Sequence, residues 1–373
     1  MPTAPRGSTR SCWPGSTRPR RRGGPAPRPS ARTRETMRVS VQLPTCTEGL
    51  VNPIPFAAAP EDFVRLAQEA ERLDYDGVWG NDHITAAPYV REHWKEPPNF
   101  YEVLITLATV GAHTRRVHLG TAIIVVPLRD PVLLAKQVAT LDRMTGGRVI
   151  LGVGIGAYRE EFLAQWPRRR DARRGELLDE GLVALRTLFT EPAASYSGLH
   201  TAFEGIEMFP KPVQRPLPIY VGGHNEQAIS RAARLGQGWL PGWRPFEEVR
   251  ERTRLLRRLT AEAGRDPRDV EAAVQFTVML GHTPEEAIAR YRKTGMVQHR
   301  RSLAHTGRDP ALAEANNLIG SPASLLEKLE FLAESGVDHL CALQFPHDSL
   351  NEMLEQMEWF ARDVVRVFKG RDR

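Results

Sequence analysis

The stretch from Arg116 to Gly156 constrains the fold more than any other part of this chain. It contains two apolar, β-branched runs, the first ending at Pro127 and the second ending in the glycines of residues 152–156. Between them lies a helical pattern that Pro131 opens and Gly146-Gly147 closes, the usual asymmetry of a helix. Two continuous apolar strands around one helix indicate a parallel βαβ unit that is covered on both faces. Glycines at the end of its second strand would let the backbone approach a ligand closely.

The rest of the chain repeats this alternation of strand and helix. Short apolar or alternating runs predict eight strands, and a helical pattern with an apolar face follows each of them. The predicted strands are residues 39–43, 77–79, 116–127, 148–156, 219–221, 238–240, 272–280 and 340–345. Strict alternation indicates parallel strands. An open doubly wound sheet is compatible with this pattern, but eight units favour an α/β fold of the closed (β/α)8 type, the TIM barrel.

Two segments interrupt the alternation. Residues 191–217 predict a small excursion, because glycine turns and several prolines replace the helical pattern. Residues 281–317 contain one helical pattern near residues 287–291 and a polar stretch with His299 and His305. We interpret residues 281–317 as an insertion before the last helix–strand–helix units.

The positive charge of the chain is concentrated at one end. The formal net charge is +6, yet residues 1–36 hold nine arginines and one glutamate, so they carry +8 and residues 37–373 carry −2. Residues 1–36 are rich in Pro, Gly, Ser and Arg, which predicts a disordered leader upstream of a natural start at Met37. The alternative is a basic tail that binds nucleic acid or anionic lipid. Residues 37–373, expected to form one domain, give no reason from charge to expect nucleic-acid binding.

Several other classes of function are not expected from the sequence. No run of about 18 apolar residues occurs and the leader lacks the apolar core of a signal peptide, so no membrane span is predicted. The three cysteines, Cys12, Cys46 and Cys341, form no disulfide or metal-binding pattern and fit a reducing cytoplasm. The 11 histidines lack ligand spacing, so no metal is predicted. The nucleophile pattern G-x-S-x-G of many hydrolases is absent.

The ends of the predicted strands locate the expected site, since activity in a TIM barrel gathers at the carboxyl ends of its strands. Two of these ends are rich in glycine, Gly154-Ile155-Gly156 and Gly222-Gly223-His224, and a helix follows the second at once. Backbone N–H groups at such turns suit an anionic group, which predicts phosphate binding, with a tight turn lacking a ligand as the alternative. The dinucleotide pattern G-x-G-x-x-G is not completed after Gly156.

His83 is the principal titratable candidate. It follows Asp82 at the end of the predicted strand 77–79, where an imidazole could act as a general base or hydrogen-bond a cofactor ring. A loop histidine bonded to nearby backbone is an equally good interpretation of the same residues. Asp82 would either orient His83 or cap the following segment.

Four stretches together resemble the bacterial luciferase-like flavin monooxygenase superfamily, in that family's order. They are GVWGNDHI, RRVHLGTAIIVVPLRDPVLLAKQVATLDRMTGGRVILGVGIG, PKPVQRPLPIYVGGHNEQAISRAARLGQGW and IGSPASLLEKLEFLAESGVDHL. The chain looks most like the actinobacterial branch of oxidoreductases that depend on coenzyme F-420 (F420), a deazaflavin.

This resemblance implies a deazaflavin, or alternatively the flavin FMN, lying across the mouth of the barrel. It implies a non-prolyl cis peptide at Ala122-Ile123 that supports the ring, and a phosphate held at the glycine-rich ends. The implied cofactor-binding residues are Ala122, Ile123, Val125, Gly154, Ile155, Gly156, Gly222, Gly223 and His224. The implied catalytic residues are His83, near the reactive ring carbon, and Asp82. The insertion would cover the site.

The implied activity is hydride transfer between a small organic substrate and F420, with His83 assisting protonation or positioning the substrate. Ile155 and Ala157 stand where sugar-phosphate dehydrogenases of the family have a hydroxyl residue and a glutamate, which argues against that substrate and leaves the proton donor unassigned. The alternatives are an FMN-dependent monooxygenase that uses reduced flavin and dioxygen, for example on alkanesulfonates, and a barrel that binds a flavin without turnover. Dimers are common in the family, so a homodimer is one expected assembly.

Overall fold

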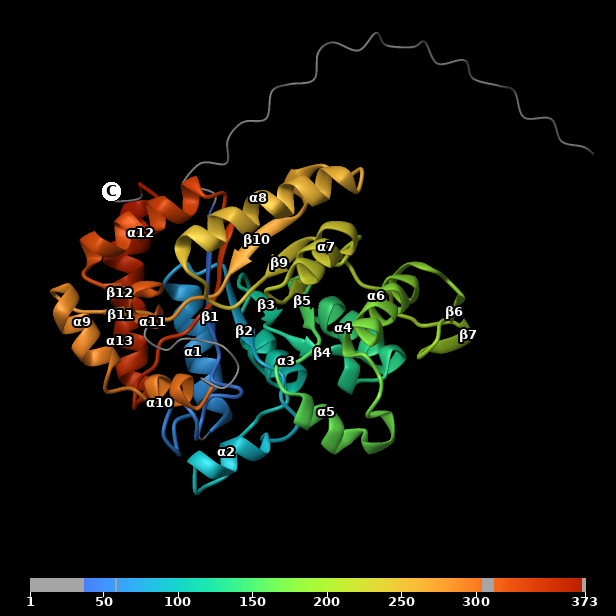
Figure 1. Cartoon of the computed structure of the whole chain (residues 1–373), viewed down its shortest axis with the longest axis horizontal. Coiled ribbons are helices and arrows are strands. Elements are labelled where there is room, and N and C mark those ends of the chain that lie inside the picture. Colours follow the sequence, from blue (N-terminus) through green and yellow to red (C-terminus); the bar gives the residue numbers. More distant parts are fainter. Residues whose placement is uncertain (1–36, 58, 304–311, 371–373) are drawn as a thin grey trace, which may run out of the picture. The chain divides into compact units, whose positions relative to one another are not determined.

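The computed structural model describes residues 37–57, 59–303 and 312–370 of the chain. Within them, eight parallel strands close into a barrel with helices around it, which confirms the predicted TIM-barrel fold (Figure 1). The order around the barrel is β1, β2, β3, β5, β8, β9, β10 and β13, and β13 pairs with β1 again. Their bounds are β1 (Arg38–Gln42), β2 (Gly77–Gly80), β3 (His118–Thr121), β5 (Val149–Gly154), β8 (Ile219–Gly222), β9 (Gly238–Leu240), β10 (Glu271–Val274) and β13 (His339–Leu343).

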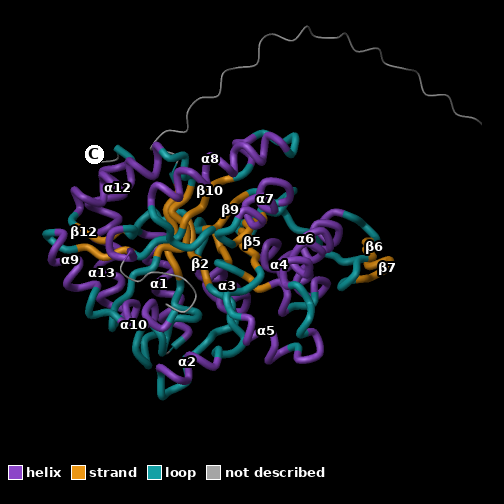
Figure 2. Tube along the Cα trace, viewed as in Figure 1, coloured by secondary structure: helices purple, strands orange, loops and turns teal. Residues whose placement is uncertain are grey.

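The helices surround the central strands, as Figure 2 shows in purple around orange. Six α-helices of the described residues begin at a side chain that accepts a hydrogen bond from the backbone N–H three residues later, the arrangement that caps a helix: Glu102, Asp130, Asn225, Thr283, Ser321 and Ser349. The connecting helices are α1 (Pro60–Arg72), α3 (Val103–His113), α4 (Pro131–Met144), α6 (Arg174–Thr190), α7 (Glu226–Leu235), α8 (Phe246–Glu262), α12 (Pro322–Glu334) and α13 (Leu350–Phe360). A π-helical turn (Ala361–Val365) and α14 (Arg366–Phe368) continue α13.

Smaller elements lie in the connections. The short helices α2 (Pro88–His93) and α5 (Arg159–Gln165) follow β2 and β5, and a two-residue strand, β4 (Ile124–Val125), follows β3. The excursion predicted at residues 191–217 contains an antiparallel hairpin of β6 (Ala194–Ser197) and β7 (Ala202–Ile206).

The prediction of one continuous seventh strand at residues 272–280 is wrong. Only β10 belongs to the barrel, whereas β11 (Val278–Leu280) pairs in parallel with β12 (Leu318–Gly320) in a separate two-stranded sheet. Both halves are apolar and buried, so hydrophobic pattern alone gives no sign that the chain changes its pairing partner.

The β11–β12 pair joins the two ends of the predicted insertion. The insertion holds α9 (Pro284–Tyr291), α10 (Gly295–Ser302) and α11 (Leu312–Ala315), and α9 packs on both strands of the pair, beside α13 (Figure 1). The polar stretch predicted without a helix therefore forms α10, because Met296 belongs to a buried cluster with Leu50, in the loop after β1, and Val90 of α2. His305 lies outside the described residues.

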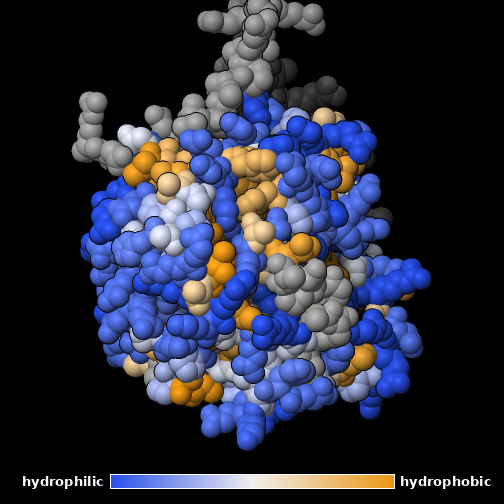
Figure 3. Space-filling model, turned by 60° about the vertical axis from the view of Figure 1, so that its left-hand side comes forward, coloured by the Kyte–Doolittle hydropathy of each residue, from blue (hydrophilic) through white to orange (hydrophobic). Residues whose placement is uncertain are grey.

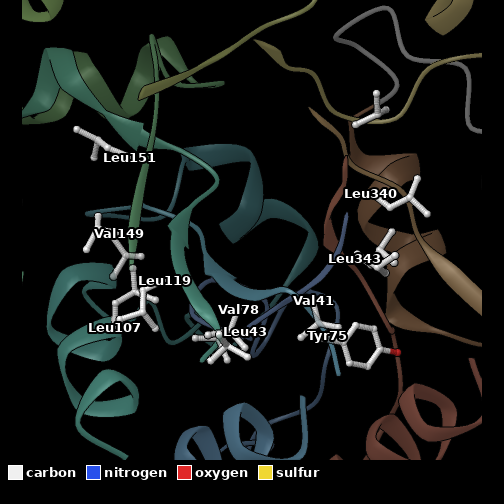
Figure 4. Close-up of a cluster of buried hydrophobic side chains, with 14 of the residues drawn as sticks. Val41, Leu43, Tyr75, Val78, Leu107, Leu119, Val149, Leu151, Leu340 and Leu343 are labelled. Carbon is white, nitrogen blue, oxygen red and sulfur yellow. The ribbon is translucent and has the colours of Figure 1, made fainter. Parts of the chain in front are cut away.

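The core has two layers. Outward side chains of the strands pack against the helices, and Figure 4 shows this layer running from Leu340 and Leu343 on β13 to Val149 and Leu151 on β5, with Leu107 of α3 beside Leu119. Inside the barrel, large rings face glycines on neighbouring strands. A Cβ atom on Gly120 would lie 2.1 Å from the ring of Trp79, and one on Gly238 would lie 2.5 Å from the ring of Tyr220. These glycines leave the space that the rings fill.

The surface is divided into small areas of different polarity. On the face seen in Figure 3, hydrophobic patches are separated by charged and polar residues. None of the helices in residues 37–57, 59–303 and 312–370 combines the length and the apolarity that a membrane crossing requires.

Candidate active site

A cavity of about 690 Å³ lies at the carboxyl ends of the barrel strands. Every site residue predicted from the sequence lines it: Asp82, His83, Ala122, Ile123, Val125, Gly154, Ile155, Gly156, Gly222, Gly223 and His224. They come from the ends of β2, β3, β5 and β8 and from the β4 segment. The structure therefore brings the predicted residues together, while their roles toward a cofactor stay predictions.

The peptide bond between Ala122 and Ile123 is cis, at the position that the family resemblance implies. β3 ends at Thr121, immediately before this bond, and the chain pairs with β5 again as β4. The side chain of Ile123 lies close to Gly154 and Gly222, since a Cβ atom at either glycine would stand 2.9 Å from it. Ile123 therefore forms an apolar shelf on the cavity wall.

Two backbone loops beside this shelf can receive an anionic group. Gly156 (φ +79°) and Gly223 (φ +134°) adopt left-handed conformations that favour glycine, and a Cβ atom on Gly223 would lie 2.6 Å from Ala228. The loop with Gly223 leads directly into α7, whose N-terminus carries a partial positive charge. The other loop is held by Arg174, which donates to the carbonyl oxygens of Ile155 (3.2 Å) and Gly156 (3.0 Å).

His83 is held by Glu161, a residue that the sequence analysis did not select. The distance from His83 Nδ1 to Glu161 Oε2 is 3.0 Å, and the glutamate side chain is 2% exposed. Glu161 also accepts from the backbone N–H groups of Ile84 (2.6 Å) and Thr85 (3.3 Å). Burial opposes ionisation of Glu161, but the hydrogen bonds from His83 and the two backbone groups outweigh it and lower the pKa of this carboxyl.

The pairing with Glu161 defines what His83 can do. An ionised carboxylate only accepts hydrogen bonds, so Nδ1 of His83 carries the proton and Nε2 is left as an acceptor in the neutral imidazole. The ring of His83 lies between Phe100 (5.2 Å between centroids) and Tyr158 (5.5 Å) on the cavity wall. His83 can therefore take up a proton from a molecule in the cavity.

Asp82 has a different partner from the one predicted. Its carboxylate accepts from Arg129 Nη2 at 2.6 Å and from the backbone N–H of Val125 at 3.0 Å, and Arg129 also contacts Glu102 at 2.8 Å. Asp82 thus holds β4 in place next to the cis peptide. Of the two predicted roles of Asp82, orienting His83 falls to Glu161 in the structure; a direct catalytic role for Asp82 stays a prediction.

The insertion contributes a buried cation to the cavity. Arg300 of α10 is 7% exposed and lines the cavity. It donates to Thr277 Oγ1 (2.6 Å) and to the hydroxyl of Tyr291 (2.7 Å), and it lies 5.0 Å from the ring centroid of Trp243. Residues of the insertion therefore form part of the cavity wall.

Two of the site residues that the sequence did not reveal hold a predicted residue from a distant part of the chain. Glu161 and Arg129 lie 78 and 47 positions along the chain from the residues they hold, His83 and Asp82. Arg300 lies in a polar stretch without any recognised pattern. Contacts of this kind depend on the closed barrel, so no local signal in the sequence could identify them.

The cavity fits a flat heterocyclic cofactor with an anionic side chain. An apolar shelf at Ile123, close backbone approach at Gly154 and Gly222, and the N-terminus of α7 supply the surfaces such a molecule needs. The volume is in the range of about 300–1,000 Å³ typical of ligand sites. In the described part of the chain, no group of three or more histidine, cysteine, aspartate or glutamate side chains could hold a metal ion.

A closed (β/α)8 barrel with these loops and a carboxylate-paired histidine at its carboxyl face defines a cofactor-binding barrel enzyme. The family described as luciferase-like monooxygenase matches residues 37–339, and the chain belongs to this family.

Individual proteins are also similar to this chain in sequence or structure. A Mycobacterium tuberculosis protein (strain ATCC 25618 / H37Rv) is 33% identical over 225 residues, covering 56% of this chain and 76% of that protein. The F420-dependent glucose-6-phosphate dehydrogenase of Segniliparus rotundus is 26% identical over 327 residues, covering 82% of this chain and 93% of that enzyme. The crystal structure of monooxygenase RslO1 from Streptomyces bottropensis has a TM-score of 0.74 at 24% identity, covering 89% of this chain and 100% of that chain.

Proposed function

We propose that this chain is an oxidoreductase that uses coenzyme F420 to move a hydride to or from a small organic substrate. The observation that carries this proposal is the His83–Glu161 pair at the wall of a cavity that Ile123 and both glycine loops also line. F420 is preferred to FMN because the similar Segniliparus enzyme is F420-dependent, and the match to this chain spans 93% of that enzyme's length.

Each group of residues has a separate task in this proposal. The loops at Gly156 and Gly223 hold the cofactor phosphate, and Ile123 supports the ring. The bound cofactor supplies the hydride acceptor or donor. Phe100 and Tyr158 exclude water from around His83.

His83 is the proposed proton acceptor. When a substrate hydroxyl is oxidised, its proton passes to Nε2 of His83, and in the reverse direction Nε2 returns it. Glu161 is a positioning residue, since it fixes the ring and keeps the proton of the neutral imidazole on Nδ1.

The substrate differs from glucose 6-phosphate in this proposal. Ala157 lines the cavity at the position where sugar-phosphate dehydrogenases of the family have a glutamate, and a methyl group cannot exchange protons. The proton-handling role therefore falls to His83.

A titration of the purified protein with F420 and with FMN tests the cofactor, with cofactor fluorescence as the signal. We expect saturable binding of F420 and much weaker binding of FMN. Tight binding of FMN with none of F420 would favour the flavin monooxygenase alternative, and failure to bind either would overturn the proposal.

The His83→Ala variant tests the chemistry. We expect it to bind F420 normally and to lose about 10²–10⁴-fold in turnover, the usual contribution of a positioned acid or base. The matched control is His113→Ala, which removes an exposed histidine at the end of α3. Unchanged turnover in the His83 variant would remove His83 from the mechanism. Cofactor binding by the native protein with no turnover of any substrate would indicate a barrel that binds without catalysis.

A further inference from the structure

Three glutamines meet on the wall of the cavity across from the glycine loops. Gln42 ends β1, whereas Gln275 and Gln344 directly follow β10 and β13. In the order of strands around the barrel, β1 and β13 stand opposite β8 and β5, whose ends carry the glycine loops. All three side chains line the cavity, and Gln42 is 4% exposed.

A β-bulge in β13 aims this cluster inward. Val39 pairs with Leu340 but Val41 pairs with Leu343, so β13 contains one extra residue. The backbone accommodates the extra residue at Ala342, which adopts a left-handed conformation (φ +49°). Since side chains alternate along a strand, the extra residue turns Gln344 to the inner face, where it would otherwise point outward.

The carbonyl oxygen of Ala342 determines which atom of each side-chain amide is the oxygen and which is the nitrogen. It can only accept, so the atom of Gln275 that lies 3.2 Å from it is the amide nitrogen. That nitrogen also donates to Gln42 Oε1 at 2.8 Å, and Gln344 Nε2 donates to the same oxygen at 3.0 Å. The amide of Gln42 therefore has its oxygen inside the cluster and its nitrogen outside it.

Two polar atoms of the cluster are left for a ligand. Within the described residues, Gln42 Nε2 and Gln275 Oε1 make no hydrogen bond, and neither is enclosed by protein atoms. One is a donor and the other an acceptor. A carboxylate or phosphate does not suit such a pair, because the acceptor oxygen would repel it.

We propose that Gln42 and Gln275 bind the oxygen of an uncharged carbonyl or hydroxyl group of the substrate. This inference rests on the proposed function, since hydride transfer interconverts these two groups. A ketone or aldehyde oxygen accepts from Gln42 Nε2. The corresponding alcohol accepts from Gln42 and donates to Gln275 Oε1 when it binds, and its O–H then turns to Nε2 of His83, which takes the proton as the hydride leaves. The pair thus fits both redox forms of one substrate.

The surroundings of the cluster specify the rest of the substrate. Leu50, Val51 and Met296 line the same cavity, and Gln42 and Gln344 also border an adjoining cavity of about 20 Å³ with Val51 and Met296. Apolar side chains around one donor–acceptor pair favour a small ketone, aldehyde or alcohol with an apolar body.

The test measures binding of cyclohexanone and of hexanoate to the protein saturated with oxidised F420, which cannot reduce the ketone. Ligand-observed NMR at pH 8 gives both dissociation constants, and cofactor fluorescence gives the affinity for F420. The Gln42→Glu variant keeps the oxygen that accepts from Gln275 and Gln344 but replaces the free nitrogen by a second oxygen. The control is Gln298→Glu, an exposed position on α10 outside the cavity lining.

We expect the native protein to prefer cyclohexanone to hexanoate, and Gln42→Glu to weaken cyclohexanone binding about 10-fold or more. The control should change it less than about twofold. The proposal is overturned if cyclohexanone does not bind, if Gln42→Glu leaves its affinity unchanged, or if that variant loses F420 instead, which would assign the glutamines to the cofactor. Failure of the native protein to bind F420 contradicts the proposed function instead.

A second variant separates recognition from support of the fold. Gln344→Met removes one hydrogen bond inside the cluster but leaves Gln42 Nε2 and Gln275 Oε1 in place. We expect lower thermal stability with cyclohexanone affinity kept within about threefold. Loss of affinity in this variant, with none in Gln42→Glu, would show that the cluster acts only through packing.

Discussion

The contact between His83 and Glu161 shows how much of the site depends on single residues. Three donors converge on one carboxylate that is almost completely buried, and this carboxylate fixes the ring that faces the cavity. His83 was identifiable from the sequence because it follows Asp82 shortly after a predicted strand. Glu161 was not, because a glutamate in a charged loop after Gly156 is an ordinary surface pattern.

Replacing Glu161 by Gln should lower stability in a pH-dependent way. At pH 7 we expect a loss of about 1.5–3 kcal/mol in the free energy of unfolding, typical of hydrogen bonds to a charged group. The folded-state pKa of Glu161 is lowered from 4.5, so its contribution is present above about pH 4.5 and is lost as the pH falls through the folded value.

Urea unfolding of the native protein and the Glu161 variant at pH 7, 5 and 3.5 checks this expectation. The difference between the two should shrink toward the lowest pH. Glu160→Gln, at the exposed neighbouring position, should show little difference at any pH. A loss that is the same at all three pH values would contradict the charged hydrogen bonds of Glu161.

At the scale of elements, prediction succeeded where local chemistry decides the structure. The helix 131–144 has a capping Asp130, a proline in its first turn and two glycines with positive φ after its end, and the structure forms it as expected. The division between β10 and β11 and the bulge at Ala342 were not predictable. Both depend on which strand lies alongside, and an apolar run carries no information about its partner.

Lys328 connects α12 to β12, the strand that follows the insertion, and its pKa gives a second test at this scale. On α12, its Nζ donates to the carbonyl oxygens of Asn317 (2.9 Å) and Ile319 (2.8 Å), which holds β12 in place. Burial lowers the pKa of Lys328 to about 8, compared with 10.5 when unfolded. Between these values the unfolded chain binds more protons than the folded chain, so stability should rise with pH.

The Lys328→Met variant lacks this titration. We therefore expect the stability of the native protein relative to the variant to rise between about pH 8 and pH 10, with a slope of at most about 1.4 kcal/mol per pH unit. Chemical denaturation across this range measures it, with Lys293→Met at an exposed position as the control. A pH-independent difference would mean that Lys328 is as well solvated in the folded protein as in the unfolded one.

At the scale of the whole molecule, the barrel was predictable because eight repeats of one pattern have few other solutions. Each βα unit must bury its strand on both faces, and closure of the sheet does this for all of them. The placement of the insertion over the cavity was implied only by family resemblance. It follows from the burial of Met296 and Tyr291 against loops far away in the chain, which no local pattern encodes. A homodimer and a cytoplasmic location stay predictions.

The site draws on strand ends from both halves of the barrel, so cofactor binding should stabilise both halves together. Binding to the folded state alone adds about 2.7 kcal/mol at a free cofactor concentration 100 times the dissociation constant. Amides that exchange only through global unfolding should then exchange about 100-fold more slowly. β2, beside His83, and β9, whose Trp239 Nε1 donates to Gly223 O at 2.9 Å, represent the two halves.

Hydrogen exchange of β2 and β9 with and without F420 tests this coupling. We expect equal slowing in the two strands, because no strand of a closed barrel can leave without opening the sheet. The helix α9, on the separate β11–β12 sheet, serves as an internal comparison, since local opening can expose it without opening the barrel. Slowing confined to β9 would show that only the half of the barrel with Gly223 and α7 binds the cofactor. His83 would then lie outside the part that the cofactor stabilises.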